Sequence, residues 1–234
     1  MKAFLRFRSK PKVLLLQTSD AEIYAPMLAI GERANRAYCE SHGFEYRSFV
    51  GLKRGHYSWH ATYNRIPLIK EIMDEGYRGW VLYLDADAYV HDLGFDIREI
   101  IGWRSEPLIA DTAGRDDYWA INAGVFLLNL GDRRGRKIAA TWYSDFMAIS
   151  DDDLIKARRW YSIASDQGLL HNLLRRDVKY RNAVRRAPPQ LLNYHNGTFV
   201  RQYLREFGPL SKRVAVMEQD IAEILTRWEL SRDE

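Results

Sequence analysis

The sequence predicts an α/β protein with a single domain, in which a mostly parallel central sheet is flanked by helices. Apolar runs of strand length alternate with helical patterns through residues 12–90, an order typical of such sheets. Polar residues follow two of these runs, at 18–20 and 85–87, where ligands bind in parallel sheets. The chain has 234 residues, 47% of them hydrophobic, which suffices for a substantial core. Because no linker interrupts the pattern, we assign residues 1–11 to a basic N-terminal segment and residues 12–234 to the domain.

The elements of the first half follow from apolar periodicity and from stop signals. A short apolar run at residues 12–17 predicts a strand that ends in the polar segment Thr18-Ser19-Asp20. Apolar residues at helical spacing predict a helix over residues 24–42, and Gly43 is a typical stop after it. We then expect a strand at 44–50, a loop at 51–57 and a helix at 63–75.

The third strand leads into two carboxylates that stand one residue apart, in Trp80-Val-Leu-Tyr-Leu-Asp-Ala-Asp-Ala-Tyr-Val90. In an extended backbone, residues two apart lie on one face, so Asp85 and Asp87 can point at the same ligand. Neighbouring carboxylates repel unless a cation or a proton intervenes, and their hard oxygens suit Mg²⁺ or Mn²⁺. The segment therefore predicts a site for a metal ion and a diphosphate, with a solvated turn after a strand as the alternative.

The second half continues the alternation of strands and helices. We expect strands at 107–110 and 119–131 and helices at 135–149 and 165–175. Asn122, Ala123 and Gly124 precede the apolar part of the second of these strands, and small residues there let a ligand approach. Ser165 is expected to cap the last of these helices, with Asp166 complementing its dipole. His195 lies in a polar loop, and another helix is expected directly after that loop.

Cysteine content and hydropathy favour a cytoplasmic protein. Cys39 is the single cysteine, so the chain cannot form an internal disulfide and suits a reducing compartment. No apolar run approaches the roughly 18 residues of a membrane span. The start of the chain is too basic, and its apolar stretch too short, for a signal peptide. We further expect that the protein can contact the inner face of the membrane as a peripheral protein.

Basic residues gather in two clusters. The first comprises Lys2, Arg6, Arg8, Lys10 and Lys12, and the second comprises Arg175, Arg176, Lys179, Arg181, Arg185 and Arg186. Such clusters attract anionic membranes or nucleic acids. Because the chain has no zinc-finger spacing and no RNA-binding signature, we expect no nucleic-acid partner and retain the anionic membrane.

Several segments stand in an order that resembles one enzyme family. They are Thr18-Ser19, Arg65-Ile-Pro-Leu-Ile-Lys70, Leu84-Asp-Ala-Asp-Ala88, Ile121-Asn-Ala-Gly-Val-Phe126, Asp166-Gln167 and Tyr194-His-Asn-Gly197. Together they resemble the retaining nucleotide-sugar glycosyltransferases of GT-A fold, in particular the galactosyl-, mannosyl- and xylosyltransferases of the fungal Golgi and plant xyloglucan type. The resemblance spans about Lys12 to Phe207 and implies a single Rossmann-like GT-A domain.

The resemblance implies metal-dependent transfer of a sugar from a nucleotide-diphosphate donor to a glycan or lipid-linked acceptor, with retention of configuration. A UDP-sugar is the favoured donor and GDP-mannose the other candidate. The implied donor contacts are Thr18, Ser19 and Asp20 at the base, Asp85 at the ribose, and Asn122, Ala123 and Gly124 at the sugar. The implied metal is Mn²⁺ or Mg²⁺, held by Asp85, Asp87 and His195. Arg65 would screen diphosphate charge, and Asp166 and Gln167 would lie near the anomeric carbon.

Two mechanisms are compatible with retention. Asp166 would act as a nucleophile in a covalent route, or would stabilise a cationic sugar during front-face attack, which we favour. Golgi members of the family carry an N-terminal membrane anchor, which we do not expect here, so their compartment is not carried over. Asn196 stands where an aromatic residue would directly follow the metal histidine, which leaves the donor sugar open.

Two other functions compete with this interpretation. Haloacid-dehalogenase-like phosphatases also place Asp-x-Asp after an apolar strand, and Asp85 would then be the phosphoryl nucleophile. Their motif usually stands near the start of the chain, whereas here it follows a full β-α-β-α unit. A non-catalytic nucleotide-sugar-binding module is the second alternative, and it would bind a donor without hydrolysis or transfer.

Two aromatic loops are the candidates for acceptor recognition. Residues 51–60 contain Tyr57 and Trp59, and residues 114–119 contain Tyr118 and Trp119. These rings either stack on sugars of the acceptor or anchor the loops by packing.

Overall fold

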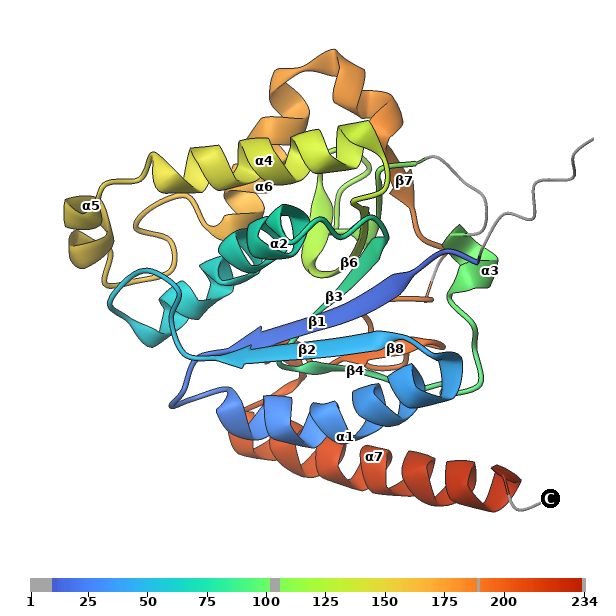
Figure 1. Ribbon diagram of the computed structural model, residues 1–234. Coiled ribbons are helices and arrows are strands. Elements are labelled where there is room, and N and C mark those ends of the chain that lie inside the picture. The colour runs from blue at the N-terminus through green and yellow to red at the C-terminus, as the bar shows by residue number, and fades with distance from the viewer. Residues whose placement is uncertain (1–9, 102–105, 189, 233–234) are drawn as a thin grey trace, which may run out of the picture.

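The computed structural model describes residues 10–101, 106–188 and 190–232, and a central sheet lies between two layers of helices (Figure 1). Most of the predicted basic segment, at residues 1–9, lies outside the described residues. The strands are β1 (Val13–Ser19), β2 (Glu45–Val50), β3 (Trp80–Asp85), β4 (Ala88–Val90), β5 (Leu108–Thr112), β6 (Ile121–Asn129), β7 (Val184–Arg186) and β8 (Val200–Gln202). The α-helices are α1 (Ala25–His42), α2 (Arg65–Asp74), α3 (Arg98–Ile101), α4 (Arg133–Met147), α5 (Asp151–Lys156), α6 (Asp166–Arg176) and α7 (Leu210–Arg232). Short 3₁₀ helices are η1 (Ser58–Tyr63), η2 (Val178–Ala183) and η3 (Arg205–Phe207).

The predicted mostly parallel sheet is confirmed. Its strand order is β2-β1-β3-β6-β5-β7, and β1 pairs in parallel with both β2 and β3. Strand β6 runs antiparallel to its neighbours β3 and β5, while β7 is again parallel to β5. The reversal at β6 follows from its connection, because the short segment 113–120 returns the chain along the strand it has just left.

The sheet has a hydrophobic core on each face, which explains why its central strands are apolar throughout. Leu15 and Leu82 pack into the core on the α1 and α7 side. Leu14 and Val81 point the other way, into the core beneath α2, α4 and α6. All seven residues of β1 are buried, as expected for a strand covered on both faces.

Most helix predictions hold. Helix α1 ends at His42, and Gly43 follows in the left-handed region at φ +67°. The helix expected at 135–149 begins two residues earlier, at Arg133. The helix expected at 165–175 is α6, and the Oγ atom of Ser165 accepts a hydrogen bond from the N–H of Gly168 at 3.1 Å, which confirms the cap.

The strand predicted through residues 80–90 is broken, so the argument from an extended backbone at the carboxylate pair was wrong. Strand β3 ends at Asp85, residues 86–87 form a turn, and residues 88–90 form β4, which pairs antiparallel with β8 in a separate sheet. The buried Gln17 side chain holds this turn, since its amide donates to the carbonyls of Asp85 at 3.2 Å and Ala88 at 3.0 Å.

Helix α7 closes the fold against α1 (Figure 1). Met217, Ile221 and Ile224 recur at helical spacing and enter the core shared with α1. Arg213 lies one turn before them and is also buried. Across the described ranges, no helix has both the length and the hydropathy needed to cross a membrane.

Candidate active site

A cavity of about 1060 Å³ lies at the edge of the sheet where β1 and β3 end. Eleven of the twelve predicted site residues line it: Thr18, Ser19, Asp20, Arg65, Asp85, Asp87, Asn122, Gly124, Asp166, Gln167 and His195. Ala123 is not among the lining residues. The fold therefore brings together segments that are up to 177 residues apart in the sequence, from Thr18 to His195.

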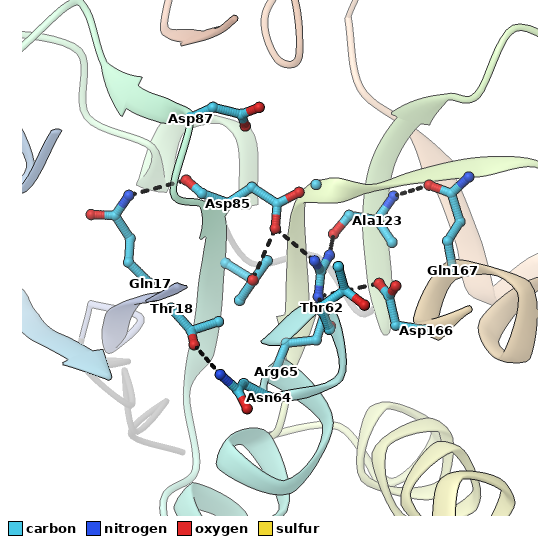
Figure 2. A network of polar contacts seen from close by, with 12 residues as sticks. Gln17, Thr18, Thr62, Asn64, Arg65, Asp85, Asp87, Ala123, Asp166 and Gln167 are labelled. Carbon is cyan, nitrogen blue, oxygen red and sulfur yellow. Dashed lines mark hydrogen bonds and ion pairs between the residues drawn. The ribbon is translucent and has the colours of Figure 1, made fainter. Parts of the chain in front are cut away.

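Arg65 is buried in the lining of the cavity, where its guanidinium clamps several protein groups together (Figure 2). Its Nη2 atom lies 2.6 Å from Oδ1 of Asp85, and its Nε atom lies 3.3 Å from Oδ2 of Asp166. Its Nη1 atom donates to the carbonyl of Ala123, and the guanidinium stacks on the ring of Tyr83 at 4.4 Å. The guanidinium of Arg65 is thus fully engaged by two carboxylates and a carbonyl. Because these groups belong to β3, α6 and β6, Arg65 links α2 to all three elements.

The two carboxylates of the motif have different partners. Asp85 Oδ1 accepts from Arg65 and, at 3.0 Å, from the hydroxyl of Tyr83. Asp87 Oδ1 accepts from Nε2 of Gln202 at 3.0 Å, and its Oδ2 lies 3.3 Å from Nη1 of Arg213. Removal from water raises the pKa of Asp85 and of Asp87, and the neighbouring cations oppose this rise.

Gln202 and Arg213 are site residues that sequence reasoning missed. Both are buried, and both reach Asp87 from the last forty residues of the chain. No sequence pattern identifies Gln202, because its contact with Asp87 depends on the pairing of β4 with β8. The sequence does contain a signal for Arg213. It is a charged residue that shares the four-residue helical spacing of Met217 and Ile221, which are buried on α7.

Small residues on β6 leave room beside Asp85. A Cβ atom at Gly124 would lie 2.8 Å from Oδ2 of Asp85 and 2.5 Å from Nε2 of Gln202, so a side chain there would fill this space. Ala123 contributes differently, because its N–H donates to Oε1 of Gln167 at 2.9 Å and its carbonyl accepts from Arg65. The backbone polar groups of Ala123 therefore serve the protein framework, and its contact with the sugar stays a prediction.

The first strand's end presents one free polar group to the cavity. Thr18 Oγ1 accepts from Nδ2 of Asn64 at 2.9 Å. Asp20 is buried, and its carboxylate accepts from the N–H groups of Ile23, Glu22 and Tyr24, so it orders the start of α1. Ser19 Oγ is buried and has no hydrogen-bond partner among the described residues. Ser19 is therefore the free donor and acceptor at this end of the cavity.

His195 lines the cavity from an exposed loop, and its ring packs against Phe207 with centroids 5.5 Å apart. The helix expected directly after this loop is not there, because residues 200–202 pair with β4 as β8 before α7 begins. In the ranges that the structure describes, no three His, Cys, Asp or Glu side chains are grouped closely enough to hold a metal ion. Metal binding by Asp85, Asp87 and His195 together stays a prediction.

The residues present nonetheless fit a divalent cation. Asp85 and Asp87 offer hard oxygen donors, and the space at Gly124 opens beside Oδ2 of Asp85. Within the described chain, Oε1 of Gln202 and both side-chain polar atoms of Asn193 are buried without a hydrogen-bond partner. Buried polar atoms normally have partners, so these groups point to a polar ligand in the cavity.

A second cation that sequence reasoning missed is available to a ligand. Arg205 lines the cavity and is exposed, and its Nε atom donates to the hydroxyl of Tyr24 at 3.3 Å. The described residues provide no carboxylate within ion-pair distance of its guanidinium. Arg205 is therefore better placed to bind an anionic ligand than Arg65, whose charge is already paired with Asp85 and Asp166.

Most of the predicted acceptor aromatics prove to be anchors. The hydroxyl of Tyr57 donates to the carbonyl of Ile155 at 2.7 Å, and that of Tyr118 donates to Leu174 at 3.0 Å. Trp59 lines the cavity, but its Nε1 atom donates to Ala157 at 3.0 Å. The ring of Trp119 packs on His171 at 5.4 Å and does not line the cavity.

Trp160, which was not predicted, is an aromatic residue that a ligand in the cavity can reach. Its side chain lines the cavity and remains 47% exposed, on the segment between α5 and α6. That segment leads directly to Asp166, the first residue of α6.

The fold is shared with glycosyltransferases of known structure. A glycosyltransferase involved in the glycosylation of the major capsid of PBCV-1 aligns with a TM-score of 0.64 and 15% identity, covering 89% of this chain and 100% of its own. The glycosyltransferase GlyE of Streptococcus pneumoniae TIGR4 aligns with a TM-score of 0.55 and 13% identity, covering 95% of this chain and 64% of GlyE. Comparison with protein-family profiles finds no match, and comparison with curated protein sequences finds none.

At these identities the likeness shows the fold alone. The chain therefore has a glycosyltransferase fold, with a cavity that contains Asp85, Asp87 and Asp166 at the carboxyl edge of its parallel strands. The resemblance to the fungal Golgi and plant xyloglucan type stays a prediction.

Proposed function

We propose that this protein is a glycosyltransferase that moves a sugar from a nucleotide-diphosphate donor to a glycan or lipid-linked acceptor. The observation that carries the proposal is the single cavity that gathers Asp85, Asp87, Asp166 and His195 on a glycosyltransferase fold. A UDP-sugar is the favoured donor, and GDP-mannose is the other candidate. Transfer with retention of configuration belongs to the proposal on the basis of the sequence resemblance.

In this proposal the nucleotide lies at the end of β1. Ser19 Oγ, the free polar group there, would bind the base or ribose, and the rings of Tyr24 and Trp59 line the same cavity. Asp20 orders the surrounding backbone through its hydrogen bonds to the segment just before α1, so this part of the cavity is formed before the nucleotide enters.

The diphosphate lies over the carboxylate pair. Asp85 and Asp87, with His195, would hold Mn²⁺ or Mg²⁺, which when bound supplies positive charge to the departing diphosphate. Gln202 and Arg213 fix the orientation of Asp87, as groups behind a metal ligand commonly do. Arg205 would add a cation from the protein itself.

The transferred sugar lies between Asn122, Gly124 and α6. The buried carboxylate of Asp166, held by Arg65, would face the positive charge that develops at the anomeric carbon, and Gln167 is fixed beside it by Ala123. In front-face attack the bond from the anomeric carbon to the diphosphate oxygen breaks, and its electron pair leaves with the diphosphate. The acceptor oxygen forms the new bond, and its proton passes to the departing phosphate oxygen.

The phosphatase alternative would use Asp85 as a phosphoryl nucleophile, which needs a free carboxylate oxygen. Oδ1 of Asp85 is held by Arg65 at 2.6 Å and by Tyr83 at 3.0 Å, so Oδ2 is the oxygen left for attack. Release of phosphate from a phosphomonoester, with no turnover of a nucleotide sugar, would identify this alternative. A non-catalytic binding module would use the same cavity. Turnover of a bound donor distinguishes an enzyme from such a module.

Donor binding tests the proposal. UDP-galactose, UDP-glucose, UDP-xylose and GDP-mannose are screened by thermal shift with Mn²⁺ and again with a chelator. At a hundredfold excess over Kd, binding adds about 2.7 kcal/mol of stability, or roughly 5–10 °C for a chain of this size. Asp87→Asn should lose the metal-dependent shift, whereas the matched surface change Asp92→Asn should keep it.

The same screen tests the proposed role of His195 as a metal ligand. His195→Ala should reduce the metal-dependent shift, and His56→Ala, which changes an exposed histidine outside the cavity lining, should not. If no nucleotide sugar shifts the melting temperature of the parent chain, the proposed donor site is wrong. If His195→Ala behaves like the parent, His195 is an ordinary loop histidine.

A further inference from the structure

A basic surface at the end of α6 forms a second pocket that shares no lining residue with the candidate active site. Its volume is about 660 Å³, and it lies between α4, the last turn of α6 and η2. The lining consists of Lys137, Thr141, Arg175, Arg176, Asp177, Val178, Lys179 and Tyr180. We call this surface the α6–η2 basic pocket.

Its four cations are only half neutralised by nearby carboxylates. Nη2 of Arg176 lies 2.6 Å from Oδ2 of Asp145, and Lys179 pairs with Asp177. These pairs are solvent-exposed on the cationic side, with the Arg176 and Lys179 side chains 58% and 59% exposed. Exposed ion pairs of this kind exchange partners at little cost, so both cations stay available to an anion.

The other two cations make no ion pair within the described chain. Lys137 is exposed on α4, and Arg175 is exposed in the last turn of α6. Arg175 lies over the ring of Trp119 at 5.4 Å, which holds the guanidinium in place without neutralising it. A local excess of positive charge therefore persists at the pocket.

The helix dipole of α6 does not account for this cluster. Cations in the last turn of a helix complement its dipole, which explains Arg175 and Arg176. Lys137 belongs to α4 and Lys179 to η2, so neither stands in that turn. Cations from three elements converge on one pocket, which is the arrangement expected for binding a multiply charged anion.

An exposed apolar side chain stands among these charges. Val178 is 73% exposed, and it is flanked in the sequence by Asp177 and Lys179. An apolar side chain next to several cations suits a membrane surface, where the cations meet headgroups and the apolar group enters the boundary of the acyl chains. A soluble phosphate would use the cations and leave Val178 in water.

We propose that the α6–η2 basic pocket binds the phosphate groups of anionic lipids and so holds the protein against a membrane surface. Helix α6 carries Asp166 at its first residue, in the active-site cavity, and Arg176 at its last, at the pocket. Eleven helical residues span about 16 Å, so lipid binding holds the cavity within roughly that distance of the headgroups. The proposal does not depend on sugar transfer.

Vesicle sedimentation tests it directly. The parent chain should sediment with vesicles of phosphatidylglycerol and phosphatidylcholine and remain in solution with phosphatidylcholine alone. Each cation near an anionic surface contributes about 1 kcal/mol, so Lys137→Glu with Lys179→Glu should weaken binding at least tenfold. Lys137→Ala alone should weaken it in the same direction by a smaller factor.

The matched control is Arg227→Glu with Arg232→Glu, which makes the same change in net charge on exposed positions of α7. This variant should bind the anionic vesicles within twofold of the parent. Equal loss in both double variants would overturn the proposal, because net charge alone would then govern binding. Sedimentation should be reduced by added pyrophosphate; a parent chain that binds pyrophosphate but no vesicles would also overturn it.

Discussion

Replacing Arg65 by methionine should destabilise the protein strongly, because two carboxylates depend on this one cation. The Arg65 and Asp166 side chains are each 4% exposed, and that of Asp85 is 30% exposed. Removing one partner of a buried ion pair costs about 3–5 kcal/mol, and the partial exposure of Asp85 favours the lower end. For a chain of this size, about 3 kcal/mol corresponds to a fall in Tm of roughly 6–12 °C.

The matched control for this change is Arg47→Met. Arg47 also bridges two carboxylates, at 2.6 Å from Glu45 and 2.7 Å from Glu75, but its side chain is 35% exposed. Exposed pairs contribute about 0–1 kcal/mol, so this variant should melt close to the parent. Both variants are measured by chemical denaturation and thermal unfolding in a chelator. Equal losses for Arg65→Met and Arg47→Met would refute the account of Arg65 as a buried clamp.

Three further outcomes follow from the site and the core. Arg205→Gln should lower kcat/KM for the donor about tenfold while leaving Tm unchanged, because the free guanidinium stabilises developing charge; an unchanged kcat/KM would exclude this role. Trp160→Ala should raise KM for the acceptor with little change in kcat, measured as initial rates against acceptor concentration, and an effect confined to the donor KM would contradict it. Burial lowers the pKa of His60, whose Nδ1 atom accepts from the N–H of His56, so the folded state keeps this ring neutral. Stability should therefore fall as pH falls below the ordinary histidine pKa of about 6.5, and His60→Gln should flatten this dependence in denaturation curves at pH 7 and pH 5.

Local signals in the sequence predicted the framework of the fold. Gly43 marks the end of α1 because a left-handed residue stops a helix, and Ser165 marks the start of α6 because its hydroxyl accepts from a free N–H. Both are interactions within a few residues of the chain. The order of strands and helices up to β3 could be predicted for the same reason.

The details of the site depend on contacts between distant segments, which sequence patterns do not encode. The turn after Asp85 is held by Gln17, 68 residues away. Asp87 is oriented by Gln202 and Arg213, which are 115 and 126 residues away. The sequence places Arg65 near the donor, but its pairing with two carboxylates became visible only when α2 and α6 were placed on the same face of the sheet.

Turnover of the donor identified by thermal shift tests the central claim most directly. Proton NMR follows the anomeric signal of the first sugar product together with release of the nucleoside diphosphate. The account predicts an α product from an α-linked donor, and Asp166→Asn should reduce turnover far more than donor binding. A donor that binds but is neither hydrolysed nor transferred would make the protein a binding module, and a β product would contradict retention.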